Sequence, residues 1–237
     1  MYWIGTSGYN YPEWRGSFYP ERFPSAKMLP FYAGRFRSVE INYTFYRMPT
    51  PSLMAGWAEA TPDGFRFTLK APQRITHVAR LRGCAQDLEA FWRAAAALGP
   101  KLGALLFQLP PAFKKDVRVL DDFLRLLSPA MRPAFEFRHP SWHDAESLAC
   151  LRSHGVALCV ADSERLSTPV EITAPHAYFR LRDEGYQDAD IVRWAATIRD
   201  AAGDCDDVFV YFKHEEQGLG PAFATRLREL LERPPAC

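Results

Sequence analysis

Eight short runs of aliphatic and aromatic residues recur along the chain, and stretches with helical periodicity separate most of them. Each run is almost continuously apolar, which is typical of a parallel β-strand that is covered on both faces. Eight strands that alternate with helices predict an α/β fold, the closed TIM-type (β/α)8 barrel. The predicted strands are residues 2–6, 38–42, 65–71, 103–109, 133–138, 156–161, 177–182 and 208–213.

The connection between the predicted sixth and seventh strands differs from the others. Residues 162–176 lack an apolar stripe of helical period and include Pro169 and Pro175. Because proline disfavours a helix interior, we expect a connection that is mostly loop and a barrel that is somewhat irregular there. Elsewhere the helix signals are regular, since Thr50 can cap a helix that starts at Pro51 and Asp144 can cap another.

The 237 residues fit one large domain or two small ones, and the 48% hydrophobic content allows a large core. No Gly/Ser tract or charge block divides the sequence, so we expect a single domain over residues 1–237. The 29 Lys and Arg residues balance 28 Asp and Glu residues. A generic nucleic-acid binder is usually more basic, although a neutral total can conceal a local basic cleft.

Cysteine spacing and hydropathy predict a cytoplasmic protein. No stretch is long and apolar enough to cross a bilayer, and the N-terminal residues resemble a strand rather than a signal peptide. We therefore expect no membrane partner. The cysteines show neither a Cys-x-x-Cys pair nor zinc-ligand spacing, as expected for reduced thiols: Cys84, Cys150, Cys159, Cys205 and Cys237.

Polar side chains gather at the ends of the predicted strands. Strand alternation places Glu136 and Arg138 on one face of the fifth strand and Phe135 and Phe137 on the other. Because barrel enzymes build their sites at the carboxyl ends of the strands, we expect the polar ends to converge on one mouth. The set comprises Glu40, Asn42, Thr68, Lys70, Gln108, Glu136, Arg138, Asp162, Arg180, Arg182, Tyr211 and Lys213.

These charges have a structural and a functional interpretation. Buried charges generally survive only when they are paired, so any one of them could belong to an ion pair that merely holds the barrel together. The cationic side chains nevertheless outnumber the acidic ones, which predicts a phosphate-bearing or otherwise anionic ligand. The comparison sets Lys70, Arg138, Arg180, Arg182 and Lys213 against Glu40, Glu136 and Asp162.

Metal-free acid–base catalysis, without a cofactor, is the chemistry that we consider first. Glu136 or Asp162 is the candidate general base. Lys70 or Arg138 is the candidate for holding the substrate anion. His77, in the long loop after the third strand, could transfer a proton. Lys70 or Lys213 could instead form a Schiff base if neighbouring arginines lower its pKa, but the sequence does not prefer this to an ion pair.

Five blocks, in order over essentially the whole chain, resemble the signature blocks of the YecE-like proteins, the family called domain of unknown function 72. They are IGTSGY (4–9), VEINYTFYRMP (39–49), KAPQRITH (70–77), FQLPPAF (107–113) and EFRHPSW (136–142). The resemblance implies a barrel related in architecture to endonuclease IV and xylose isomerase, without an established activity. It implies these site residues: Glu40, Asn42, Tyr46, Lys70, Arg74, His77, Gln108, Glu136, Arg138, His139 and Trp142.

The segment after the eighth predicted strand departs from the usual form of the family. Many members have Phe-Asn-Asn there, whereas this chain has Phe212, Lys213 and His214. A ligand contact made at this place, with Lys213 among the candidate ligand-binding residues, therefore differs in charge.

Two alternative functions remain open. The first is a divalent-metal-dependent phosphodiesterase or hydrolase like endonuclease IV; His77, His139, His143 and His214 could meet the carboxylates, but no His-x-His or His-Glu-x-x-His spacing occurs, and we assign no metal ligand. The second is a non-catalytic nucleic-acid-binding protein, in which aromatic residues stack on bases or sugars beside arginines. The aromatic candidates are Trp3, Tyr9, Tyr11, Trp14, Tyr19, Tyr43, Tyr46 and Trp142.

Overall fold

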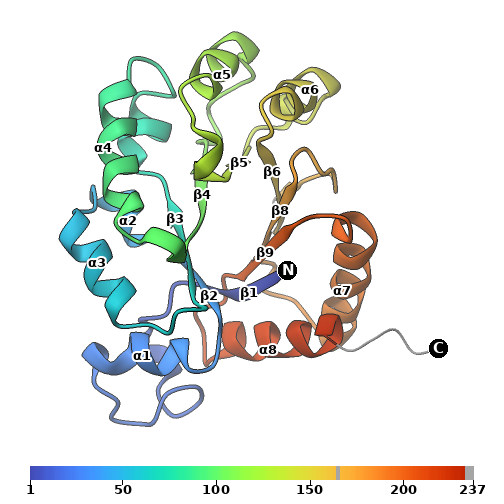
Figure 1. Ribbon diagram of the computed structural model, residues 1–237. Coiled ribbons are helices and arrows are strands. Elements are labelled where there is room, and N and C mark those ends of the chain that lie inside the picture. The colour runs from blue at the N-terminus through green and yellow to red at the C-terminus, as the bar shows by residue number, and fades with distance from the viewer. Residues whose placement is uncertain (164–165, 233–237) are drawn as a thin grey trace.

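The computed structural model describes residues 1–163 and 166–232 of the chain. Eight parallel strands form a closed barrel, and helices surround it (Figure 1). The strands follow chain order around the barrel, and the pairing of β9 with β1 and of β5 with β6 completes the circle. They are β1 (Tyr2–Ser7), β2 (Ser38–Ile41), β3 (Arg66–Lys70), β4 (Leu102–Gln108), β5 (Pro133–Glu136), β6 (Ala157–Ser163), β8 (His176–Leu181) and β9 (Asp207–Phe212).

This confirms the predicted barrel, and the signals at the helix termini act as expected. Thr50 Oγ1 accepts a hydrogen bond from the backbone N–H of Leu53 at 3.2 Å. Asp144 accepts one from the N–H of Ser147 at 3.0 Å. The helices are α1 (Met28–Ala33), α2 (Tyr43–Tyr46), α3 (Pro51–Glu59), α4 (Ala85–Ala96), α5 (Val117–Leu124), α6 (Ala145–Ser153), α7 (Asp188–Ala202) and α8 (Leu219–Glu232).

Shorter helical turns complete the connections. The turn η3 (Arg74–Val78) is π-helical and follows the carboxyl end of β3, on the mouth side of the barrel. None of the helices within the described ranges combines the length and the apolar character needed to span a bilayer. The remaining turns are 3₁₀-helical: η1 (Pro12–Trp14), η2 (Ser25–Lys27), η4 (Gly99–Lys101), η5 (Pro129–Met131) and η6 (Pro140–Trp142).

The connection between β6 and β8 is irregular, as predicted. Its described residues contain no helix but a two-residue strand, β7 (Leu166–Ser167), which pairs antiparallel with the end of β6. Thr173 fastens the rest of the connection, because its hydroxyl accepts from the N–H of Leu158 at 2.7 Å and donates to the carbonyl of Val156 at 2.6 Å. This tie replaces the packing that a crossover helix would supply.

The barrel interior changes character along its axis. Small and aromatic side chains fill its middle, among them the buried Cys159; Cys237 lies outside the described residues. The Tyr211 hydroxyl bonds Ser38 Oγ at 2.6 Å and Thr68 Oγ1 at 2.8 Å. Beyond this tyrosine, the inner face becomes polar toward the carboxyl ends of the strands. The interior apolar cluster is Trp3, Ala104, Leu106, Ala134, Ala157, Cys159, Ala161, Tyr178, Phe209 and Tyr211.

Gly5 is required for the close approach of β1 to β2. A Cβ atom at Gly5 would lie 2.0 Å from the carbonyl oxygen of Ser38, a backbone atom that cannot rotate away. We expect Gly5→Ala to lower the free energy of unfolding by about 1–3 kcal/mol or more. Gly56 in α3 has open space around it, so the control Gly56→Ala should raise stability by about 0.5–1 kcal/mol. Urea denaturation measures both; equal stabilities would contradict the packing described here.

Candidate functional site

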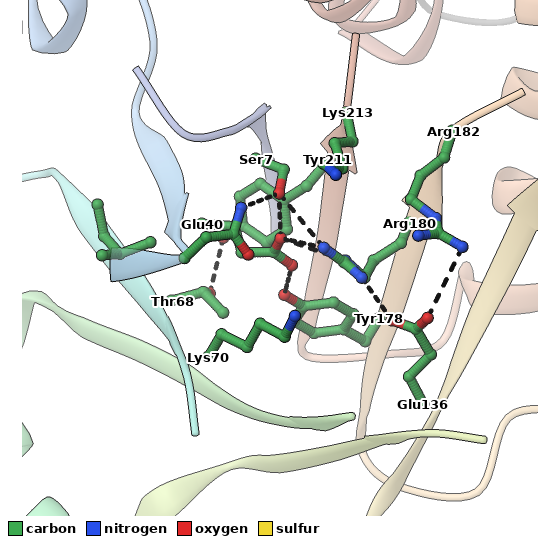
Figure 2. Close-up of polar contacts among 12 residues, drawn as sticks. Ser7, Glu40, Thr68, Lys70, Glu136, Tyr178, Arg180, Arg182, Tyr211 and Lys213 are labelled. Atoms are coloured by element: carbon green, nitrogen blue, oxygen red, sulfur yellow. Dashed lines mark hydrogen bonds and ion pairs between the residues drawn. The ribbon is translucent and has the colours of Figure 1, made fainter. Parts of the chain in front are cut away.

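Arg180 lies at the centre of the mouth, between two carboxylates from distant strands. Its Nη2 is 2.8 Å from Glu40 Oε1 and its Nη1 is 2.5 Å from Glu136 Oε2 (Figure 2). Strand alternation turns all three side chains inward, and each is almost completely buried. One guanidinium therefore links β2, β5 and β8 across the barrel interior.

Glu40 is held by three neighbours. Ser7 Oγ donates to Oε1, the Tyr178 hydroxyl donates to Oε2 at 2.5 Å, and Arg180 Nε adds a contact to Oε1 at 3.2 Å. Asn42 Nδ2 in turn donates to Ser7 Oγ at 2.8 Å. Burial opposes ionisation of Glu40, but the charge of Arg180 and these donors outweigh it and lower the pKa of the carboxyl. Glu40 is therefore ionised, and both of its carboxylate oxygens already accept hydrogen bonds from neighbouring side chains.

Glu136 faces three guanidinium groups. Besides Arg180, Arg138 Nε lies 3.0 Å from its Oε1, and Arg182 Nη2 lies 3.9 Å from the same atom. Burial again opposes ionisation, yet Arg180, Arg138 and Arg182 hold the pKa of Glu136 far below its usual range. A carboxylate held this firmly as an anion is a poor general base near neutral pH.

Lys70, on the inner face of β3, is buried without an ionic partner. Its Nζ lies 3.9 Å from the ring centroid of Phe45, and the described residues place no carboxylate within salt-bridge distance of it. Burial and the charge of Arg180 lower the pKa of Lys70 to about 7, although Glu136 acts in the opposite direction. The amine is therefore partly neutral near pH 7.

His77 lies beside this amine, on η3. Its ring packs edge-on against Phe45 at 4.9 Å between centroids, and its Nδ1 is 2.9 Å from Thr76 Oγ1. Burial, together with the charges of Lys70 and Arg138, lowers the pKa of His77 to about 4. Near pH 7 the imidazole is therefore neutral.

Two buried donors at the mouth lack an acceptor within the described part of the chain. They are Gln108 Nε2 and Arg182 Nε. Gln108 pairs in register with Glu136 and helps to lower the pKa of that carboxyl, but its amide nitrogen does not meet a partner at hydrogen-bonding geometry. Lys213 lies further out, with its Nζ 3.7 Å from Glu215 Oε1. The mouth therefore contains hydrogen-bond donors that no acceptor among the described residues satisfies.

Asp162 is not brought to the mouth. The sequence places it after the sixth strand, whereas β6 continues to Ser163 and turns Ala161 inward and Asp162 outward. There Asp162 accepts hydrogen bonds from the hydroxyl of Tyr186 at 2.6 Å and from Trp194 Nε1 at 3.2 Å. The expectation that Asp162 faces the ligand is therefore corrected, because its carboxylate binds side chains outside the barrel.

Trp142 and His139 hold the chain that leaves β5. Trp142 is fully buried, stacks on Phe137 at 4.7 Å, and donates its Nε1 hydrogen to the carbonyl of Phe113. His139 Nδ1 accepts from the N–H of Ser141 at 3.2 Å and so caps η6. The indole N–H of Trp142 and the Nδ1 of His139 are therefore already engaged in holding this segment.

Arg74 and Tyr46 lie apart from the central cluster. The Arg74 side chain is 74% exposed and pairs with Asp87 of α4 at 2.9 Å, which ties η3 to that helix. Tyr46 is 70% exposed on α2, with Phe45 as its ring neighbour at 5.1 Å. Of the residues that the family resemblance implies, these two are the most exposed to solvent.

The predicted histidines do not meet the mouth carboxylates. His214 Nε2 donates to the carbonyl of Asp183 at 2.7 Å and packs among aromatic rings. Among residues 1–163 and 166–232, one group of three metal-ligating side chains converges, namely Asp121, Cys150 and His154. It lies between α5 and α6, outside the barrel, and Asp121 is also paired with Arg125.

Sequence reasoning missed three residues of this cluster. Ser7 and Tyr178 bind Glu40, and Phe45 covers Lys70. Their positions carried a signal, since Tyr178 precedes Arg180 by two residues and must share its face of β8. A tyrosine and a serine are also ordinary core residues, so only the position of Glu40 shows that they are part of the site.

Comparisons with known proteins agree on one family. A family model described as "Protein of unknown function DUF72" matches residues 3–236. The UPF0759 protein YecE of Escherichia coli K12 is 31% identical over 183 residues, which cover 75% of this chain and 63% of YecE, so the match spans less than two thirds of that relative. The UPF0759 protein YunF of Bacillus subtilis 168 is 26% identical, with 98% and 95% covered.

A solved structure gives the same result. The crystal structure of a DUF72 family protein from Thermotoga maritima MSB8 superposes with a TM-score of 0.88 at 27% identity. The superposition covers 98% of this chain and 100% of that one.

Removing Arg180 should expose the cost of burying two carboxylates. We expect Arg180→Met to lower the free energy of unfolding at pH 7 by about 3–5 kcal/mol, because Glu40 and Glu136 stay buried without their shared cation. Arg152 pairs with Glu171 at the surface, so the control Arg152→Met should cost less than about 1 kcal/mol. Urea denaturation provides the measurement.

The loss of unfolding free energy in Arg180→Met, relative to the wild type, should become smaller as the pH falls. In the wild type the pKa values of both carboxyls are lowered, so their contribution is present above about pH 4.3, the usual value for glutamate, and is lost as the pH falls. In the variant these pKa values should rise, and protonation should shrink the deficit between pH 7 and about pH 5. A deficit that is constant over this range would contradict the assignment.

Proposed function

This chain belongs to the DUF72 family, a family of unknown function, and we propose that it binds a phosphate-bearing or other anionic ligand at the carboxyl-end mouth of its barrel. In this proposal Lys70 exchanges a proton with the ligand, without a metal. The observation that carries it is the surplus of positive charge around Glu136 once Arg180 has been neutralised.

The charges divide into a structural and a free set. Arg180 takes up the charge of Glu40 and shares Glu136 with Arg138 and Arg182. With Arg180 neutralised by Glu40, Glu136 is the one carboxylate left for the two guanidinium groups of Arg138 and Arg182, and such a site attracts an anion. Lys70 adds a further cation when it is protonated, whereas Lys213 pairs with Glu215 at the rim.

The unpartnered donors indicate which chemical group of the ligand would bind here. Buried N–H groups rarely remain without an acceptor, and an oxyanion can accept from several of them at once. The N–H groups of Gln108 Nε2 and Arg182 Nε suit a tetrahedral oxyanion or a carboxylate. We therefore place the anionic group of the ligand beside Gln108, Arg138 and Arg182.

The acid–base group in this proposal is an amine rather than a carboxylate. Glu136 is firmly ionised and Asp162 faces away, so neither suits the general base proposed from the sequence. The pKa of Lys70 of about 7 matches the working range of an acid–base group. His77, neutral at that pH, can donate or accept a hydrogen bond beside it.

The two alternatives gain less support. A metal at the mouth would compete with Arg180 for both Glu40 and Glu136, and the described residues offer no convergent histidine there. Stacking on nucleic acid needs exposed rings, but four of the candidates are buried, either in the barrel interior or in the loops. Tyr43 and Tyr46 of α2 remain exposed. The buried candidates are Trp3, Trp14, Tyr19 and Trp142.

The first test is the affinity for inorganic pyrophosphate at low ionic strength. We expect Arg182→Gln to weaken binding by about tenfold or more, because a hydrogen bond to a charged group contributes about 1.5–3 kcal/mol. The matched control Arg93→Gln, which removes a surface pair with Glu89, should bind as the wild type does. Isothermal titration calorimetry measures both affinities. Equal affinities of Arg182→Gln and wild type would contradict this place for the anion.

The second test is the pH dependence of sulfate binding. Sulfate keeps its charge between pH 6 and pH 8, whereas the ammonium fraction of Lys70 falls as the pH rises through about 7. We expect the dissociation constant to rise about three- to tenfold over this range. Lys70→Gln should remove the dependence, and the exposed control Lys27→Gln should keep it. The same slope in Lys70→Gln would exclude Lys70 from the anion site.

A further inference from the structure

The geometry at the end of β3 points to a covalent chemistry that the proposed function does not require. We infer that Lys70 Nζ attacks the carbonyl carbon of a small aldehyde or ketone that bears an anionic group, and that the product is an imine. The inference rests on the proposed function, because the anion site supplies the place for the charged end of such a compound.

Lys70 differs from a lysine that serves only in an ion pair. It is 9% exposed, and the two carboxylates of the mouth are already bound to Arg180. Its contact is with the face of Phe45, which offers no hydrogen-bond acceptor of carboxylate strength. In Figure 2 the Lys70 side chain extends toward Tyr178, and no dashed line reaches its nitrogen.

Charged groups from every element around the amine act on it. Arg180 of β8 and Arg138, beyond the end of β5, disfavour the ammonium form, whereas Glu136 of β5 and Glu40 of β2 favour it. His77 on η3 is neutral near pH 7 and does not alter this balance. With burial included, the pKa is about 7, so roughly half of the amine is a free nucleophile at pH 7. An exposed lysine, with a pKa of about 10.4, is less than about 0.1% neutral there.

Lys101 is a comparison within the same chain. It is 8% exposed, so it is buried to the same degree as Lys70. Its Nζ, however, donates to the carbonyl oxygens of Ala58 and Thr61, both at 2.6 Å. The hydrogen bonds fix Lys101, the last residue of η4, as a structural donor to the end of α3. Lys70 makes no such bond to any residue that the structure describes, and it projects into the mouth.

The reaction balances without another reactant. The nitrogen lone pair of Lys70 forms the C–N bond, and the π electrons of the carbonyl move to its oxygen. Both hydrogens of the neutral amine then leave with that oxygen as water, and the C=N bond forms. Arg138, Arg182 and Gln108, which lie around Glu136, would hold the anionic group, so the ligand class is a phosphorylated aldehyde or ketone, or an oxo acid.

Reductive trapping tests the inference on the whole wild-type chain, so no variant needs to fold. The protein is incubated at pH 7 with cyanoborohydride and either glycolaldehyde phosphate or uncharged glycolaldehyde. Hydride from the reductant converts an imine into a stable secondary amine, and peptide mapping by mass spectrometry gives the rate at each lysine. The six sites are Lys27, Lys70, Lys101, Lys114, Lys115 and Lys213.

We expect glycolaldehyde phosphate to modify Lys70 at least tenfold faster than Lys27 or Lys101. The rate at Lys70 should level off above about pH 8, while the rate at exposed Lys27 keeps rising with pH. Inorganic pyrophosphate should slow the reaction at Lys70 and leave Lys27 unaffected. Modification of Lys70 at the rate of Lys27 would overturn the inference.

The outcomes separate the imine from the anion site. If pyrophosphate binds and Lys70 does not react preferentially, the imine is refuted and the proposed function stands. If Lys70 reacts preferentially but equally fast with charged and uncharged glycolaldehyde, the amine is reactive as inferred and the anion site is refuted.

Discussion

The ion pairs of Arg180 with Glu40 and Glu136 are the interaction on which the mouth depends. Moving each ion out of water costs several kcal/mol, so the arrangement is tolerable only because each carboxylate meets further donors. The pairs link three strands that are far apart in the sequence. They also commit both buried carboxylates, so that the remaining side chains at this end of the barrel are mostly cationic.

The same interaction connects stability with reactivity. Burial lowers the pKa of Lys70, and the charge of Arg180 lowers it further from across the barrel. The sequence suggested carboxylates as the catalytic acid–base groups of the mouth, whereas the structure favours the amine of Lys70. Glu40 and Glu136 maintain the geometry and the field, and Lys70 is the residue with two accessible protonation states near neutral pH.

The sequence predicted the barrel because eight apolar runs leave few other folds, and strand alternation correctly placed Glu40, Lys70 and Glu136 on the inner face. The expectation failed for Asp162 because β6 continues through it to Ser163 and pairs with β7, so that alternation turns its side chain outward; neither feature has a clear sequence signal. The pairing of Arg180 with Glu40 joins residues 140 positions apart, so no local pattern could show which charges neutralise each other. The resemblance supplied Trp142 without a role, which the structure shows to be packing.

The central claim is that the mouth holds an anion beside Gln108, Arg138 and Arg182 while Arg180 stays with its carboxylates. Anomalous diffraction from crystals soaked in sodium selenate tests it most directly, because selenium marks the anion by its own signal. We expect a selenium peak within hydrogen-bonding distance of Arg182 and Gln108, with the contacts of Arg180 to Glu40 and Glu136 unchanged. Selenate bound only at surface arginines, or bound by Arg180 after it leaves a carboxylate, would contradict it.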